Sequence, residues 1–134
     1  MKHWHKGLIL AGAVIAAGAA WAAPAAVQAI IDSYAAAGGA NFSADAGKAL
    51  FQANHTGGNP DTPSCTTCHT TDPKNVGHTR AGKEIAPMAS SLSPDRFADP
   101  AKVEKWFGRN CNTVLGRECT AQEKGDILTY LSNL

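Results

Sequence analysis

The chain has 134 residues, of which 44 % are apolar and 17 % charged, and its twelve Lys or Arg side chains nearly balance eleven Asp or Glu. This length suits a single domain, and the formal net charge of +1 lacks the basic excess expected of a nucleic-acid-binding protein. Thirteen glycines and seven prolines are scattered along the chain, which argues against a fibrous or low-complexity protein. Four cysteines in so short a chain are the most informative feature of the composition.

The first 22 residues have the pattern of a secretory signal peptide. Lys2 and Lys6 precede an uncharged, apolar run over residues 7–20, and Ala20-Trp21-Ala22 places small residues at the positions that a signal peptidase reads. The run is shorter than the roughly 20 residues that span a bilayer. We therefore expect cleavage after Ala22 and no membrane span after processing. The mature domain, residues 23–134, would lie in the periplasm, where paired thiols can oxidise.

The mature chain begins with two predicted helices and a loop. Residues 25–37 are rich in Ala, place apolar side chains at helical spacing and stop at a glycine pair. Ser43 can cap a second helix over residues 44–53, with Gly47 on its apolar face. Residues 54–64 hold two Gly, two Pro, two Asn and an Asp, which predicts a loop.

The segment Cys65-Thr66-Thr67-Cys68-His69 carries the strongest chemical signal in the chain. Two thiols at this spacing can form thioether bonds to the vinyl groups of a haem, and the adjacent imidazole then reaches the iron as proximal ligand. C-x-x-C-H is therefore typical of c-type haem attachment. A thioredoxin-like redox motif would need a βαβ pattern, which is not visible, and a zinc site would need a second close cysteine pair. We expect one covalently attached haem c.

A polar segment and two helix-start signals follow the motif. Residues 70–83 are polar and irregular, and Ser93-Pro94 and Asp99-Pro100 each place a capping residue before a proline at the first helical position. The second signal predicts a helix that closes at Gly108. The residues of this helix expected to face inward are Val103, Trp106 and Phe107.

A capping box, Thr120-x-x-Glu123, predicts a last helix that runs to about Asn133. The sequence has no internal repeat, no heptads and little strand signal. We therefore predict a small all-α domain wrapped around one haem.

The second cysteine pair, Cys111 and Cys119, encloses seven residues and has no histidine or further thiol nearby to complete a metal site. In an oxidising compartment such a pair is expected to form a disulfide. Closing so small a loop contributes roughly 2.5 kcal/mol in the chain-entropy model. The bond would staple a small domain and also hold the backbone beside Asn110 and Asn112.

The residues alone leave the sixth iron ligand open. Met88, the only methionine of the mature chain, lies 19 residues after His69, and a pocket-lining role suits it better than a distal one. His55 and His78 lie in polar loops, where histidine is ordinarily exposed. The remaining segment is Gly108-Arg109-Asn110-Cys111-Asn112. An amide oxygen is a neutral, hard and weak donor that suits ferric iron, although either asparagine can instead cap a turn.

The order of elements resembles a class I cytochrome c, in which an N-terminal helix with G-x-x-L-F, the haem motif, a proline-containing loop and a C-terminal helix follow one another. In such folds the glycine lets the two terminal helices approach closely, which implies Gly47 against Tyr130 or Leu131. The loop proline implies that the Pro87 carbonyl accepts the Nδ1–H of His69, a contact that fixes the ring and raises its basicity.

Five strings carry a closer resemblance: Pro63-Ser64-Cys65-Thr66-Thr67-Cys68-His69, Thr79-Arg80-Ala81-Gly82-Lys83-Glu84-Ile85-Ala86-Pro87, Pro94-Asp95-Arg96-Phe97, Val103-Glu104-Lys105-Trp106 and Gly108-Arg109-Asn110-Cys111-Asn112. Over essentially the whole mature chain they resemble the sphaeroides haem protein family. The resemblance implies that Asn110 is the sixth ligand, bound to ferric iron and released on reduction. We expect Pro87, Met88 and Trp106 at the haem pocket, Met88 standing where the family has another aliphatic residue.

The same resemblance implies that the vacated site binds O2, NO, CO or cyanide-like small ligands, with electrons from a dihaem cytochrome c. If such a protein is an enzyme, it is an oxidoreductase that reduces O2 or converts NO to nitrate, and Arg80 or Arg109 can stabilise bound anionic oxygen. Two other classes stay open: a simple electron carrier with Met88 as permanent ligand, and a gas sensor, for which the mature chain shows no output domain. We favour the ligand-binding class.

One surface feature is ambiguous in the sequence. Its basic residues can form either a docking patch for an acidic partner or an ordinary solvated face, and the near-neutral total charge favours neither. The residues concerned are Lys83, Lys102, Lys105 and Arg109.

Overall fold

The computed structural model describes residues 25–134, and the predicted signal peptide, residues 1–22, lies outside them. The described chain forms the helices α1 (Ala25–Ala36), α2 (Ala44–Gln52), α3 (Thr66–His69), α4 (Pro100–Leu115) and α5 (Ala121–Ser132), and a two-stranded hairpin of β1 (Gly77–His78) and β2 (Glu84–Ile85). The predicted all-α class is confirmed. Within residues 25–134 no helix combines the length and the apolar character that crossing a membrane requires.

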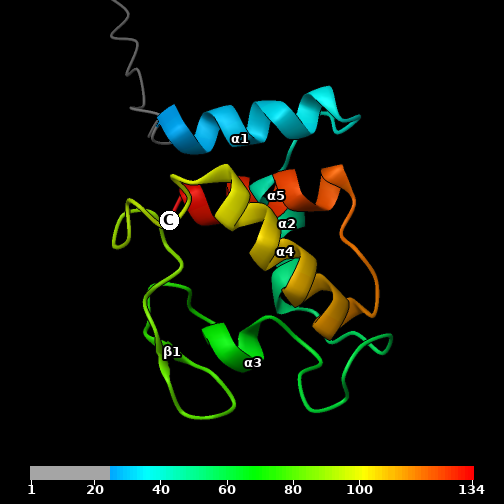
Figure 1. Cartoon of the computed structure of the whole chain (residues 1–134), viewed down its shortest axis with the longest axis vertical. Helices are drawn as coiled ribbons and strands as arrows, with labels where there is room; N and C mark the ends of the chain where they lie inside the picture. Colours follow the sequence, from blue (N-terminus) through cyan, green and yellow to red (C-terminus); the bar gives the residue numbers. More distant parts are fainter. Residues whose placement is uncertain (1–24) are drawn as a thin grey trace, which may run out of the picture.

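Helix α5 is the centre of the packing, because both α1 and α2 lie against it. Apolar residues at helical spacing on these three helices form the core, and the side chains of Val27, Leu128 and Leu131 are almost completely buried. Figure 1 shows α1 along one end of the molecule and α3 with β1 at the opposite end, with α4 and α5 between them. The helical frame therefore leaves α3 and the hairpin together, away from α1.

The close approach of the terminal helices occurs at Gly47, one turn earlier on α5 than expected. A Cβ atom at Gly47 would lie 2.9 Å from the backbone nitrogen of Ile127, and closer still to the backbone of Asp126. The prediction that Gly47 meets Tyr130 or Leu131 was wrong about the partner residues and right about the helix. Any side chain at residue 47 would push α2 off α5, because backbone atoms cannot rotate aside as side chains do.

Helix α4 is longer than the sequence pattern suggested. It does not close at Gly108 but continues to Leu115, where Gly116 adopts a left-handed conformation (φ 71°) and donates its N–H to the Asn112 carbonyl. One helical glycine costs only about 1 kcal/mol, and the apolar stripe continues through the buried residues Cys111 and Val114, which offsets that cost.

The predicted caps of α2, α4 and α5 are confirmed. Ser43 accepts a hydrogen bond from the backbone of Ala46, Asp99 caps the start of α4, and Thr120 with Glu123 forms the complete capping box of α5. By contrast, Ser93-Pro94 opens only a turn, in which the N–H of Arg96 reaches the Ser93 carbonyl.

The hairpin within the segment predicted to be irregular is short, because Gly77 pairs with Ile85 and His78 with Glu84 and no further residues pair.

Candidate functional site

A cavity of about 1100 Å³ lies between α3, the hairpin, α4 and α5. Most of its wall area is apolar and comes from the helical core, and polar and charged residues of the helices, the hairpin and the loops also line it. The predicted site residues that line it are Cys65, Cys68, His69, Met88, Trp106, Asn110 and the disulfide pair Cys111 and Cys119. Of the two arginines expected near bound oxygen, Arg80 lines the cavity and Arg109 does not. The fold thus brings together side chains from distant parts of the sequence.

The three motif side chains share one face because the motif is helical. The N–H groups of Cys68 and His69 both reach the Cys65 carbonyl, at 3.3 and 3.1 Å. Residues at positions i, i+3 and i+4 of a helix point the same way, so both sulfurs and the imidazole line the cavity together. Strand β1 packs directly behind, because Gly77 lies against the Cys68 backbone without room for a Cβ atom.

Burial sets the protonation of these groups. Cys65 and Cys68 are free cysteines, and burial raises the pKa of the Cys65 thiol to about 11, with Cys68 adding to the effect. Burial, together with the smaller effect of the nearby charge of Arg96, lowers the pKa of His69 to about 4. At neutral pH the imidazole is therefore uncharged and has a free nitrogen lone pair, which is the form that binds metal.

Pro87 does not occupy the place we expected for it. Its carbonyl accepts a hydrogen bond of 2.8 Å from Nε of Arg96, and the Ala86 carbonyl accepts another from the same guanidinium. No hydrogen bond joins the Pro87 carbonyl to Nδ1 of His69, which is buried and has no hydrogen-bond partner among the described residues. Pro87 is also not part of the cavity wall, although Met88 and Arg96 are. The charged guanidinium of Arg96, which is half-buried, is a stronger hydrogen-bond donor than a neutral imidazole N–H, and it binds both carbonyls.

On α4 the two asparagines next to Cys111 have different surroundings. Asn110 lines the cavity, one turn after Trp106. Asn112 is rotated from it by roughly 200° around the helix axis. It is not part of the cavity wall, and its amide donates to the Gly108 carbonyl at 2.7 Å. Of the two candidates, Asn110 alone is part of the cavity wall.

The other candidate ligands also differ in whether they line the cavity. Met88 lines the cavity and packs against the buried core, as a pocket residue would. His55 also lines the cavity, with its Nε2 atom 3.1 Å from the Leu50 carbonyl. His78 is exposed on β1 and is not part of the wall.

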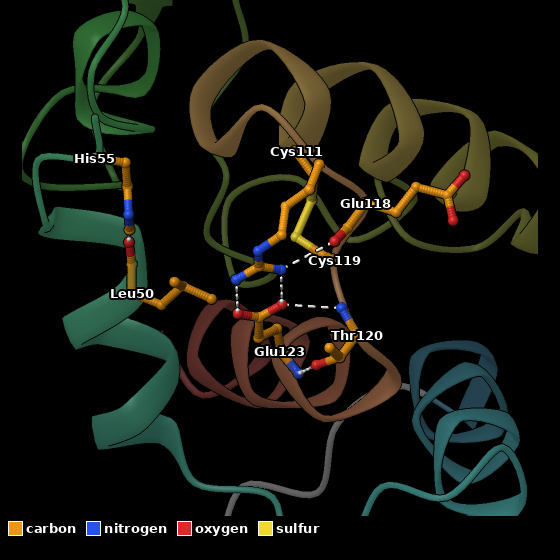
Figure 2. A network of polar contacts seen from close by, with 8 residues as sticks. Leu50, His55, Cys111, Glu118, Cys119, Thr120 and Glu123 are labelled. Carbon is orange, nitrogen blue, oxygen red and sulfur yellow. Dashed lines mark hydrogen bonds and ion pairs between the residues drawn. A yellow bond between two sulfur atoms is a disulfide. The ribbon is translucent and has the colours of Figure 1, made fainter. Parts of the chain in front are cut away.

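The end of α4 that carries Asn110 is held by three kinds of contact. A disulfide joins Cys111 to Cys119, and Figure 2 shows it beside Thr120 and Glu123 at the start of α5. Arg117, in the connection between the helices, forms an ion pair of 2.7 Å with Glu123. From the opposite side, the N–H of Asn59 reaches the carbonyl of Thr113 at 2.7 Å. The backbone of α4 beside Asn110 is therefore fixed.

Known proteins are similar to this chain in sequence and in fold. Residues 37–131 match the family described as a domain of unknown function (DUF1924). The chain is 55 % identical over 118 residues to the cytochrome c-type protein SHP of Cereibacter sphaeroides, covering 88 % of this chain and 92 % of that protein. The chain belongs to the sphaeroides haem protein family.

Solved structures agree with this assignment. Oxidised SHP, described as an oxygen-binding cytochrome c, is similar to this cytochrome with a TM-score of 0.78 and 56 % identity, covering 81 % of this chain and 96 % of the other. A solution structure of cytochrome c'' from Methylophilus methylotrophus has a TM-score of 0.67 and 33 % identity, with 81 % and 93 % covered. The protein is thus a monohaem cytochrome c with one covalently attached haem c.

The residues at the cavity fit this cofactor. Two free thiols and an uncharged imidazole share one wall, and the remaining wall is largely apolar. The cavity is also as large as the sites that hold sizeable organic ligands, which run to about 1000 Å³. The buried Nδ1 of His69 has no hydrogen-bond partner within residues 25–134, so no hydrogen bond to another protein group fixes the orientation of the ring before a cofactor is bound.

Sequence reasoning missed the contacts that Arg96, Arg117 and Asn59 make near the site. In the sequence, Arg96 was noted only within one of the segments that resemble the family. An arginine that follows a turn-forming Ser-Pro can bind the carbonyls of a neighbouring loop, as the half-buried Arg96 does. The ion pair of Arg117 with Glu123 was also missed, because Glu123 was assigned only to the capping box. No local pattern indicates that Asn59 reaches Thr113, since the two residues are distant in the sequence.

Proposed function

We propose that this cytochrome binds small diatomic ligands, O2 and NO, at a haem whose sixth ligand is the displaceable Asn110. Cys65 and Cys68 would form the thioether bonds, and His69 would be the proximal ligand. The observation that carries the proposal is the position of Asn110, the asparagine of α4 that lines the cavity and whose backbone is held by the disulfide next to it.

When bound, the haem supplies an iron that coordinates diatomic molecules and changes oxidation state by one electron. The protein controls access through the ligand it offers. An amide oxygen is hard and uncharged, so Asn110 would hold ferric iron in preference to ferrous iron and would leave readily. Because the α4 backbone is fixed at Cys111, only the Asn110 side chain would have to rotate. His69 is uncharged at neutral pH and can stay bound throughout.

The relatives support this proposal. The solved SHP structure is described as an oxygen-binding cytochrome c, and the solution structure of cytochrome c'' is described in terms of haem-ligand detachment. A displaceable sixth ligand in this chain would match both descriptions.

The test is the visible spectrum of the holoprotein, ferric and dithionite-reduced, before and after addition of CO. We expect a high-spin, five-coordinate ferrous spectrum that shifts completely with CO. Asn110→Ala should change the ferric spectrum and leave CO binding intact, whereas Asn112→Ala, the matched control, should change neither. A low-spin ferrous spectrum that ignores CO would refute the proposal.

A simple electron carrier is the second candidate, and the presence of Met88 in the cavity wall favours it. A thioether sulfur is a soft ligand that remains on ferrous iron, so such a protein would not bind CO. Met88→Leu separates the two functions. If Met88 is the sixth ligand, this variant gains CO binding that the wild type lacks. If Asn110 is the ligand, wild type and variant both bind CO.

The finer chemistry is proposed from the resemblance to the family. We propose that a dihaem cytochrome c supplies the electrons and that the reduced protein acts on O2 or NO. Anaerobic reduction of the protein by a purified dihaem cytochrome c, followed by exposure to O2 and NO with nitrate measured as product, tests both steps. Failure of the dihaem protein to reduce it would remove that partner, and absence of nitrate would remove the NO conversion.

We also propose that residues 1–22 are a signal peptide and that the mature domain, residues 23–134, lies in the periplasm. The charged start, the short apolar run and Ala20-Trp21-Ala22 support export. The intact mass of the holoprotein purified from periplasmic extract should correspond to a chain that begins at Ala23 with one haem added. A mass that includes residues 1–22 would contradict this.

A further inference from the structure

The solvent-facing side of α4 carries a stripe of cations with a tryptophan in it. Lys102, Lys105, Trp106 and Arg109 stand at positions i, i+3, i+4 and i+7, so they share one face of the helix. All four residues are exposed, and 46 % of the Trp106 surface is open to solvent. We refer to these four residues as the α4 cationic face.

None of the charged side chains of this face forms an ion pair within residues 25–134. The three ion pairs found in residues 25–134 join Arg80 to Asp61, Arg117 to Glu123 and Lys124 to Glu104. None of them includes a residue of the α4 cationic face, and Glu104 on the same helix is already bound by Lys124.

The α4 cationic face gathers more positive charge than the overall composition of the domain predicts. Residues 25–134 carry ten Lys or Arg (the chain's twelve less Lys2 and Lys6) against eleven Asp or Glu, a net charge of −1. Three of these ten cations stand on two turns of one helix. The capping carboxylate of Asp99 is the nearest acid before them on the helix, and it accepts hydrogen bonds from the backbone N–H groups of Ala101 and Lys102.

Trp106 connects this face to the cavity. Its side chain is half exposed and also lines the cavity wall, as does Lys102. The Arg109 guanidinium lies over the Trp106 ring, 5.3 Å from its centroid, a geometry that holds both side chains in place through a cation–π contact. A partner that covers Trp106 would therefore be separated from the cavity by a single aromatic side chain.

We propose that the α4 cationic face is the docking surface for an acidic electron-transfer protein that reduces the haem. The inference rests on the proposed function, in which the protein receives electrons from another redox protein. One electron leaves the reduced cofactor of the partner, and the haem passes from the ferric to the ferrous state. No covalent bond forms or breaks.

Charge complementarity selects this class of partner. A short cationic stripe on a nearly neutral protein steers an acidic protein surface to one place and raises the association rate. An aromatic residue with a flanking arginine is the kind of pair that carries binding energy at the centre of a protein interface. Nucleic-acid binding would need a far larger basic surface.

The test measures how fast the ferric holoprotein is reduced in a stopped-flow instrument by flavodoxin in its hydroquinone state, a small acidic flavoprotein used as probe. The double variant Lys105→Glu with Arg109→Glu reverses two charges of the α4 cationic face at residues that are not part of the cavity wall. The control double variant, Lys48→Glu with Lys74→Glu, makes the same change in net charge at two exposed lysines outside the cavity wall.

We expect the second-order rate of the wild type to fall as ionic strength rises from about 0.01 M to about 1 M, because the Debye length shrinks from roughly 30 Å to roughly 3 Å. At low salt the α4 double variant should be reduced about tenfold more slowly than the control double variant. Reduction by dithionite, which needs no protein docking, should be equal in both at about 1 M ionic strength, where the charge of this small anion is screened. Arg109→Gln should lower the flavodoxin rate in the same direction.

Equal flavodoxin rates in the two double variants, or a wild-type rate that does not fall with salt, would overturn the docking surface. The CO spectrum of each variant is recorded in parallel. Failure of CO binding in the wild type would refute the ligand-binding function and leave the docking result standing, so the two proposals fail separately.

Discussion

The packing of α2 on α5 predicts that Gly47→Ala strongly destabilises the protein. The added Cβ would lie 2.9 Å from the backbone nitrogen of Ile127 and nearer still to the backbone of Asp126, inside the 3.0 Å limit that Cβ contacts essentially never cross. The two helices must then separate, which loosens the contacts of the buried side chains Phe51 and Leu128. Overpacking of this kind costs about 1 to 3 kcal/mol.

The magnitude follows from two opposing effects. Backbone atoms cannot move aside, so we take the overpacking cost at the upper end of this range, about 3 kcal/mol. Alanine is a better helix former than glycine by about 1 kcal/mol, which offsets part of the loss. The net loss is about 2 kcal/mol, which lowers Tm by about 10 °C in a domain of this size.

The matched control is Gly108→Ala, which puts the same substitution into another helix. A Cβ at Gly108 would meet nothing within 4 Å, so the change should raise the stability by up to about 1 kcal/mol. Thermal unfolding of the ferric holoproteins, followed by far-ultraviolet circular dichroism, measures both. A Gly47→Ala protein as stable as wild type would show that the contact between α2 and α5 does not require glycine.

Three further predictions concern the link between α4 and α5. The hydrogen bonds and charge of Arg117 lower the pKa of Glu123 to about 2, so its stabilising effect is complete above about pH 4.5 and disappears as the pH falls towards 2. In denaturant unfolding, Glu123→Gln should therefore cost about 1 kcal/mol at pH 7, after allowance for solvent screening, and nothing near pH 2; a pH-independent difference would contradict this. Replacing both Cys111 and Cys119 with Ser should lower the free energy of unfolding by roughly 2.5 kcal/mol, and an unchanged denaturant midpoint would refute that estimate. Thr120→Ala removes half of the capping box and should cost about 1 kcal/mol by the same measurement, with Thr129→Ala, which loses only a bond within its own helix, as the milder comparison.

Local patterns predicted most of the fold. The caps at Ser43, Asp99 and Thr120 depend on interactions between neighbours in the chain, so the sequence indicates where these helices begin. The end of α4 was placed too early because Gly108 is a permissible helix residue and Gly116 is the one with a positive φ angle, a difference that composition does not reveal. The hairpin was missed because two residues per strand leave no period to detect.

The site was predictable where spacing determines it. The C-x-x-C-H spacing puts three side chains on one helical face, and the helix period separates Asn110 from Asn112 once α4 is known to continue past Gly108. The contact of Arg96 with Pro87 was not predictable, because it depends on how two loops meet. The identity of the residues that bind the haem stays a prediction, and the spectra of the Asn110 and Met88 variants decide it.

The distance between the cysteines has a consequence for how the chain matures. Wherever thiols oxidise, Cys111 has a partner eight residues away in Cys119, whereas Cys68 lies 43 residues away. The entropy of closing the longer loop is less favourable by about 1.5 kcal/mol, which favours the local pair roughly tenfold. Early formation of the Cys111–Cys119 disulfide therefore limits which thiols stay free. It removes Cys111 and Cys119 before either can pair with the cysteines that would hold the haem, Cys65 at the cap of α3 and Cys68 within it.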